Sequence, residues 1–281
     1  MALHILTDSA CDIDLSQQEK LHFTIFPLKV FFGDTCYIEG ENLTKEQFYT
    51  MLAASSELPK TTQINPLDFE EVIRPWVEAG DEILILPLSK ELSGTYQSAI
   101  LAKESFPDAA IYVVDTLNVT FGQALLVQAA LDMREQGMKA GEIFEAITEL
   151  VPRVRLYAVI DDLKYLRLGG RLSSAGAVVG TLLGIKPLIA LQDGKVVNIA
   201  KARGQKAGYQ MIVEKVREDG IDGDYPVYFG HSNAPEMMKE LIELMNSSVS
   251  LPDVYESDIG PVVGTHAGPG CTGIAFIAKA K

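Results

Sequence analysis

The feature that most constrains the fold is an alternation of apolar strands and helices in the first half of the chain. Residues 82–88 form a continuous apolar run, which is typical of a strand buried on both faces of a parallel sheet. A helical pattern follows this run, and helical patterns also follow the predicted strands at residues 4–7 and 110–114. Helices in the crossovers between such strands predict a parallel sheet covered by helices.

The second half shows a different order of elements. The pair Asp193-Gly194 lies between two apolar segments and is a strong hairpin signal. Strands are expected at residues 156–160, 186–191, 195–200, 226–230, 254–258, 261–265 and 274–278, and helices at residues 203–218 and 234–245. A length of 281 residues favours two domains. We expect an N-terminal parallel α/β domain over residues 1–154 and a C-terminal α/β domain with a mixed or antiparallel sheet over residues 155–281.

Local signals place two helix starts and one extended link in the first half. Thr44 and Gln47 have the spacing of a capping box, which predicts a helix over residues 45–54. Asn65 followed by Pro66 predicts another helix that runs to about residue 78. Residues 58–64, between these helices, are expected to form an extended polar link.

Composition bounds the possible function classes. A hydrophobic fraction of 47 % with 22 % charged residues is ordinary for a soluble globular protein with a real core. The net charge of -14 argues against broad binding of nucleic acid or anionic membranes, which requires a basic surface. The three cysteines are widely separated, and the chain has neither a secretory signal nor a run of ~18 apolar residues, so a reduced cytoplasmic protein is expected. The apolar run at residues 175–185 is expected to belong to the core or to border a narrow cavity.

A histidine in a glycine-rich turn is the first candidate functional residue. His266 follows the strand expected at residues 261–265 and lies within Gly264-Thr265-His266-Ala267-Gly268-Pro269-Gly270. Ser93-Gly94 follows the carboxyl end of the buried strand at a helix start, where free N–H groups favour an anion. Together with Thr61 and Thr62, these residues could hold a carboxylate or phosphate through neutral donors. The alternative is structural: a turn histidine, an ordinary helix cap and turn threonines.

Several sharper motifs are rejected. Residues 268–273 fit G-x-G-x-x-G, but too few residues follow to complete a strand, helix, strand unit, so a dinucleotide site is excluded. The chain has no phosphate-binding loop of the G-x-x-x-x-G-K-[ST] type, and Ser93 does not lie in G-x-S-x-G. The four histidines and the cysteines show no metal-ligand spacing. We therefore predict neither a nucleotide site nor a metal site.

A basic segment stands out in this acidic chain. Between residues 161 and 206 there are eight basic residues and three acidic ones. Arg167 and Arg171 lie four positions apart across the end of a short predicted helix, and Lys201 and Arg203 follow the predicted hairpin. Such a segment is either a solvated face or a docking patch for an acidic partner.

Short motifs along nearly the whole chain resemble the DegV family, the bacterial fatty-acid-binding proteins also called FakB. The matching pieces are Leu6-Thr7-Asp8-Ser9, Lys60-Thr61-Thr62-Gln63 with Pro66, Leu88-Ser89 with Leu92-Ser93-Gly94-Thr95-Tyr96, Asp115-Thr116, Leu163-Lys164-Tyr165-Leu166 with Gly169-Gly170-Arg171, and Gly264-Thr265-His266-Ala267-Gly268-Pro269-Gly270. Each piece is weak alone, and their order and number carry the resemblance.

The resemblance implies a two-domain α/β fold that binds one long-chain fatty acid in a buried tunnel between the domains. It implies that Thr61 or Thr62, Ser93 with Gly94, and His266 hold the carboxylate. A soluble fatty acid kinase would use ATP to convert the bound acid to an acyl phosphate for phospholipid synthesis, so this chain would not be an enzyme and would need no metal or cofactor. Membrane contact would be transient at most.

The resemblance also assigns the basic segment to the docking of that kinase, with Arg171 first and Arg167, Lys201 and Arg203 as further contacts. Two alternatives stay open. The chain could be a hydrolase or acyltransferase that uses Ser93 with His266, although the usual elbow around the serine is missing. It could also be a lipid-responsive regulator, which would differ mainly in its partner.

Overall fold

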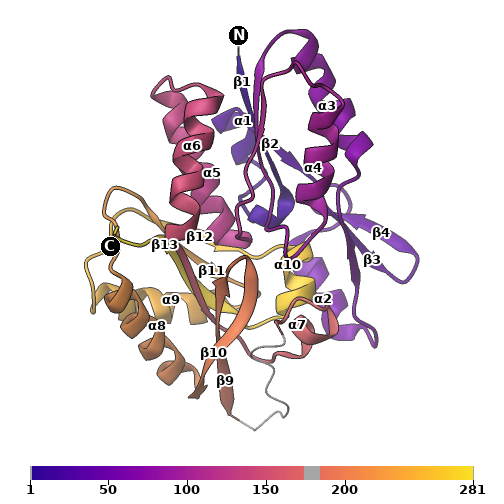
Figure 1. The fold of residues 1–281 in the computed structure, drawn as a ribbon. Helices are drawn as coiled ribbons and strands as arrows, with labels where there is room; N and C mark the ends of the chain where they lie inside the picture. Colours follow the sequence, from indigo (N-terminus) through magenta and orange to yellow (C-terminus); the bar gives the residue numbers. More distant parts are fainter. Residues whose placement is uncertain (1, 174–183, 281) are drawn as a thin grey trace.

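The computed structural model describes residues 2–173 and 184–280 and contains a parallel sheet, a mixed sheet and a small antiparallel sheet (Figure 1). Most of the apolar run at residues 175–185 therefore lies outside the described residues. The strands of the parallel sheet come from the first half of the chain, and those of the mixed sheet begin at Val154. The predicted division after residue 154 falls one residue beyond that start, within the first strand of the mixed sheet, and the short helix η2 (Val151–Arg153) precedes this strand.

The first sheet is parallel, as predicted, with the strand order β2-β1-β6-β7. Its central strand β6 is fully buried from Ile83 to Leu86, which explains the continuous apolar run. Figure 1 shows α3 and α4 on one side of this sheet and α5 and α6 on the other. The elements are β1 (Leu3–Asp8), η1 (Ser9–Cys11), α1 (Gln17–Leu21), β2 (Thr24–Phe26), α3 (Pro66–Glu78), β6 (Glu82–Leu86), α4 (Thr95–Glu104), β7 (Ile111–Val113), α5 (Thr120–Glu135) and α6 (Ala140–Leu150).

Both predicted helix starts are confirmed. Helix α2 (Lys45–Ala54) begins with a capping box, in which Gln47 N donates to Thr44 Oγ1 at 3.1 Å and Thr44 N donates to Gln47 Oε1 at 2.9 Å. At α3, Asn65 Oδ1 accepts from Leu67 N at 3.2 Å.

The second sheet is mixed, with the strand order β10-β9-β8-β13-β11-β12. Strands β11 and β12 pair in parallel, and the other neighbouring strands pair antiparallel, including the predicted hairpin around Asp193-Gly194. Helix α5 packs against both large sheets, and α8 and α9 also pack on the second one. The elements are β8 (Val154–Val159), α7 (Lys164–Leu168), β9 (Ile185–Gln192), β10 (Lys195–Arg203), α8 (Gln205–Asp219), β11 (Val227–His231), α9 (Pro235–Asn246), β12 (Val254–Asp258) and β13 (Thr272–Ile277).

The link expected at residues 58–64 contains a strand of the third sheet. Strand β5 (Lys60–Thr62) pairs with β3 (Lys29–Phe32), which also pairs with β4 (Thr35–Ile38). Thr61 lies opposite Val30 in this register. The backbone of Thr61 and Thr62 is thereby held by a ladder of hydrogen bonds rather than by a free loop.

The strand expected at residues 261–265 is wrong: this segment belongs to the helix α10 (Pro261–Ala267). Pro261 occupies the first turn, where a missing N–H costs nothing, and Gly268 ends the helix with φ +70°. Gly264 allows close packing on α2, because a Cβ at this position would lie 2.7 Å from the Phe48 ring and from the Tyr49 hydroxyl. A short apolar run does not distinguish strand from helix by its periodicity, and tertiary packing selects the helix here.

Candidate functional site

A cavity of about 400 Å³ lies where the two halves of the chain meet. Its wall is mostly apolar and comes from both halves, including Ala10, Leu28, Leu88, Val119, Phe121, Leu156, Ala158, Ile189, Leu191, Val196, Ile259, Val262 and Val263. The volume lies within the range of ~300–1,000 Å³ that is usual for sites that take small molecules. The cavity is therefore suited to an apolar ligand.

All five residues predicted for anion binding line this cavity: Thr61, Thr62, Ser93, Gly94 and His266. Thr61 Oγ1 and His266 Nε2 are 2.9 Å apart, although 205 positions separate them in the sequence. Strand β5 holds the threonine, and the last turn of α10 holds the imidazole. The fold thus brings together residues that spacing alone could not connect.

The loop after β6 places Ser93 and Gly94 at the start of α4. Ser93 Oγ lies 3.0 Å from Thr95 Oγ1 and accepts from Thr95 N at 3.3 Å. A Cβ on Gly94 would lie 2.0 Å from Gln63 Oε1, so a larger residue here would have to displace the Gln63 side chain, which also lines the cavity. The wall here consists of hydroxyl groups and helix-start backbone, and O–H and N–H groups of this kind can donate hydrogen bonds to an anionic head group.

His266 is neutral near neutral pH. Burial, and then the positive charge of Arg171, lower the pKa of its imidazole to about 4. Its Nδ1 has no hydrogen-bond partner and lies against Gly169, where a Cβ would be only 2.2 Å away. An uncharged imidazole beside the Thr61 hydroxyl can donate or accept one hydrogen bond without bringing a second positive charge.

Arg171 contributes to the cavity itself, which the sequence did not reveal. Its guanidinium donates to Leu92 O at 3.0 Å and to Gly169 O at 2.6 Å, and the residue lines the cavity near His266. A guanidinium beside an anion site supplies the charge that neutral donors lack. In the sequence, Gly169-Gly170 indicates the end of the short helix before Arg171, but no local signal gives the direction in which the Arg171 side chain points.

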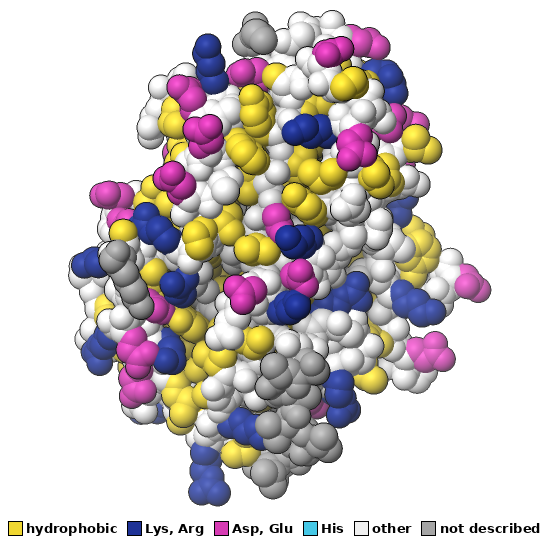
Figure 2. Space-filling view, viewed as in Figure 1, with side chains coloured by type: hydrophobic (Ala, Val, Ile, Leu, Met, Phe, Trp, Pro, Cys, Tyr) yellow, Lys and Arg dark blue, Asp and Glu magenta, His cyan; other side chains and the backbone are white. Residues whose placement is uncertain are grey.

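The other predicted docking residues lie on the surface. Arg167, Lys201 and Arg203 are exposed and do not line the cavity. Figure 2 shows basic side chains toward the lower end of the visible face, where β9 and β10 lie. Their docking role stays a prediction.

The geometry does not favour a serine hydrolase. Ser93 Oγ is paired with Thr95 and has no hydrogen bond to His266, and in residues 2–173 and 184–280 no carboxylate orients the imidazole through Nδ1. A nucleophile, a base and an orienting acid are thus not assembled. No group of three or more His, Cys, Asp or Glu side chains among these residues could hold a metal ion. The helices in the same part of the chain are too short or too polar to cross a membrane.

Comparison with known proteins gives the family. The model of the DegV family, described as a family of uncharacterised proteins, matches residues 2–279. A DegV domain-containing protein of Caldanaerobacter subterraneus subsp. tengcongensis is 33 % identical over 276 residues, which cover 98 % of each chain.

Solved structures extend this likeness to the fold. A DegV lipid binding protein from Thermotoga maritima has 31 % identity and a TM-score of 0.89, with 100 % of both chains covered. The Fatty Acid Kinase B3 protein of Streptococcus pneumoniae, solved loaded with linoleic acid, has 25 % identity and a TM-score of 0.85, with 99 % of this chain and 100 % of that chain covered. The family match, the sequence relatives and the shared fold together show that this chain belongs to the DegV family.

Proposed function

We propose that this protein binds one long-chain fatty acid in the central cavity and presents its carboxylate to an ATP-dependent fatty acid kinase. The observation that carries the proposal is the cavity itself, an apolar chamber with one polar end formed by hydroxyl groups, an imidazole and a guanidinium. The lipid bound to the similar Streptococcus pneumoniae protein supports the choice of ligand.

Burial of the acyl chain would supply the affinity. At ~0.8 kcal/mol per methylene, about fifteen methylenes contribute on the order of 12 kcal/mol before the costs of association. Part of that is lost in restricting the ligand and the side chains around it. The remainder supports a tight carrier, provided that the carboxylate keeps hydrogen bonds inside the protein.

The polar end would meet that requirement. Thr61 or Thr62, Ser93 with the backbone at Gly94, and His266 would donate to the carboxylate, while Arg171 would balance its charge. A carboxylate oxygen would then attack the γ-phosphorus of ATP on the partner kinase, which yields an acyl phosphate and ADP for phospholipid synthesis. The catalytic groups for this transfer would belong to the kinase, so this chain would carry and present the substrate.

Native mass spectrometry tests lipid binding directly. Protein purified from bacterial cells should show a mass excess equal to one fatty acid, which disappears when the protein is denatured. Identification of the released acid by mass spectrometry would give its chain length and its number of double bonds. Protein that is free of lipid and takes up no added C16 or C18 acid would contradict the proposal.

Kinase docking has a separate test. A variant with Arg167→Glu, Lys201→Glu and Arg203→Glu should lose on the order of tenfold or more of acyl phosphate formation, because rim charges steer association. Its lipid content should stay unchanged, since the three side chains are exposed and lie outside the cavity. A variant with Lys20→Glu, Lys103→Glu and Lys139→Glu reverses the same number of charges at exposed positions outside the basic segment and the cavity, and it is the matched control. Equal loss of phosphorylation and of lipid would show that these residues support the ligand site instead.

A further inference from the structure

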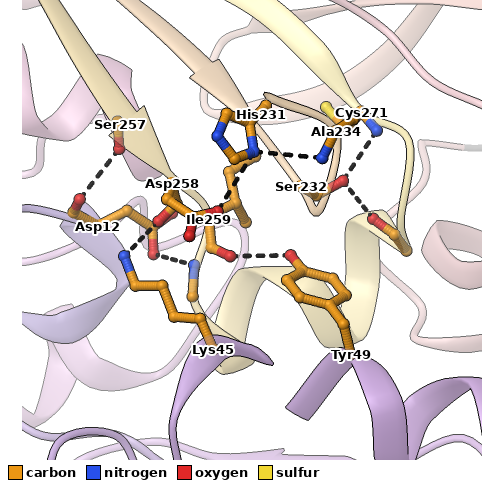
Figure 3. Close-up of polar contacts among 12 residues, drawn as sticks. Asp12, Lys45, Tyr49, His231, Ser232, Ala234, Ser257, Asp258, Ile259 and Cys271 are labelled. Atoms are coloured by element: carbon orange, nitrogen blue, oxygen red, sulfur yellow. Dashed lines mark hydrogen bonds and ion pairs between the residues drawn. The ribbon is translucent and has the colours of Figure 1, made fainter. Parts of the chain in front are cut away.

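Three consecutive residues, 258–260, lead into α10, and a backbone group of each is bound by a side chain from the first half of the chain. Figure 3 shows these contacts, with Lys45 and Tyr49 reaching up from α2 and Asp12 from the end of η1. The bonds run from Lys45 Nζ to Asp258 O, from Tyr49 Oη to Ile259 O at 2.8 Å, and from Gly260 N to Asp12 Oδ1 at 2.9 Å. We call Asp12, Lys45 and Tyr49 the α10 clamp.

Asp12 is the buried centre of this clamp. Its side chain is 5 % exposed, its backbone has φ +54°, and its carbonyl accepts from Ser257 Oγ at 3.0 Å. Burial raises the pKa of its carboxyl to about 7, a rise that Lys45 opposes and Glu39 reinforces. Burial of a carboxyl group costs free energy, and the hydrogen bond from Gly260 N offsets part of that cost.

The other titratable groups around Asp12 come from several elements. The pKa values of Cys11, Tyr49 and Cys271 are each raised, first by burial and further by the negative charge of Asp12. Thr120, at the start of α5, lines the cavity, and its hydroxyl lowers the pKa of the Asp12 carboxyl. Asp12 therefore lies directly behind the cavity wall, between α5 and α10.

Helix α10 carries the effect of the clamp to the ligand site. His266 is six residues from Gly260, a distance of only ~9 Å along a helix that rises 1.5 Å per residue. Between these two residues, Gly264 packs closely on Phe48 and Tyr49 of α2, the helix that also carries Lys45 of the clamp. Because Ile259 and Val262 also line the cavity, a shift at the start of α10 would move both its apolar wall and its imidazole.

We propose that the α10 clamp positions the ligand site, and that its residues set the distance between His266 and Thr61. This inference rests on the proposed function for the nature of the ligand. The clamp residues are positioning residues, because they act on the ligand only through α10. Their loss would loosen the polar end of the cavity while the cavity itself remains.

Fluorescence titration with cis-parinaric acid, a fluorescent C18 fatty acid, tests the effect on binding. Asp12→Ala should weaken binding roughly tenfold or more, because it leaves Gly260 N without its buried acceptor. Asp12→Asn retains an oxygen at the same position and should recover most of the affinity. Asp14→Ala removes an equal charge from an exposed site two residues away and serves as the matched control.

NMR titration of the His266 ring supplies a readout that reduced overall stability alone would not change. In the native protein this ring should stay neutral down to about pH 4, and in Asp12→Ala its pKa should rise toward the ordinary value of 6.5 as water enters. Tyr49→Phe deletes only the hydroxyl bound to Ile259 O, and it should likewise weaken binding of cis-parinaric acid and raise the pKa of His266. If Asp12→Ala does not fold, this variant alone tests the clamp.

Two results would separate the possible failures. Unchanged affinity and unchanged His266 titration in both Asp12→Ala and Tyr49→Phe would overturn the clamp; if Asp12→Ala does not fold, the same result in Tyr49→Phe alone would do so. A native protein that binds no cis-parinaric acid would instead count against the proposed function. The NMR titration would then still test the clamp, because it needs no ligand.

Discussion

Replacement of Ala158 by phenylalanine should abolish loading with fatty acid while the chain still folds. Ala158 lies on β8 in the middle of the second sheet, is 1 % exposed and lines the central cavity. A phenyl ring there would fill space that the acyl chain needs. If it excludes about four methylenes, the loss is ~3 kcal/mol, which is more than a hundredfold in affinity.

Titration with cis-parinaric acid and native mass spectrometry would both measure this loss. Ala54→Phe adds the same ring to an exposed position at the end of α2 and should bind lipid normally. Circular dichroism would show whether Ala158→Phe keeps its secondary structure. A folded Ala158→Phe protein with native affinity would mean that the lipid binds somewhere other than this cavity.

Gly268→Ala should be strongly destabilising, because this glycine closes α10 in a backbone conformation that other residues rarely adopt. Its φ of +70° and ψ of 177° lie in a region that is essentially restricted to glycine, at a cost of ~1–3 kcal/mol for any other residue. A Cβ would also lie 2.2 Å from the ring of Tyr165 on α7. We expect a loss of about 3 kcal/mol in the free energy of unfolding, together with reduced lipid content because His266 would be displaced.

Chemical denaturation would measure that loss. Gly223→Ala is the matched control, since this glycine has an ordinary φ and no atom within 4 Å of an added Cβ. It should unfold at nearly the native denaturant concentration. Equal midpoints for Gly268→Ala and the native protein would show that the turn behind His266 can relax without cost.

Elements with strong local signals could be predicted from the sequence. The apolar run of β6 and the capping box at Thr44 depend on residues close together in the chain, and both are confirmed. Residues 261–265 of α10 are predicted as a strand, because a five-residue run with two adjacent valines carries no clear periodicity. Packing on α2, through Gly264, selects the helix.

The candidate site was predictable in part. Thr61, Ser93 and His266 were visible as polar residues at bends or helix starts, and they do line one cavity. Asp12 has no such signal, because its partner at Gly260 is 248 positions away. The inward position of Arg171 was hidden for a related reason: a basic segment shows the amount of charge but not the direction of each side chain.

Helix α5 links the folding of the two halves. It is buried along its first eight residues and packs against β1 and β6 on one side and against β8, β11 and β13 on the other. A fragment that ended at residue 154 would leave much of this helix facing water, and a fragment that began at residue 155 would expose the opposing face of its sheet. The chain should therefore unfold as one cooperative unit, and a molecule held between the halves would raise the melting temperature of both together.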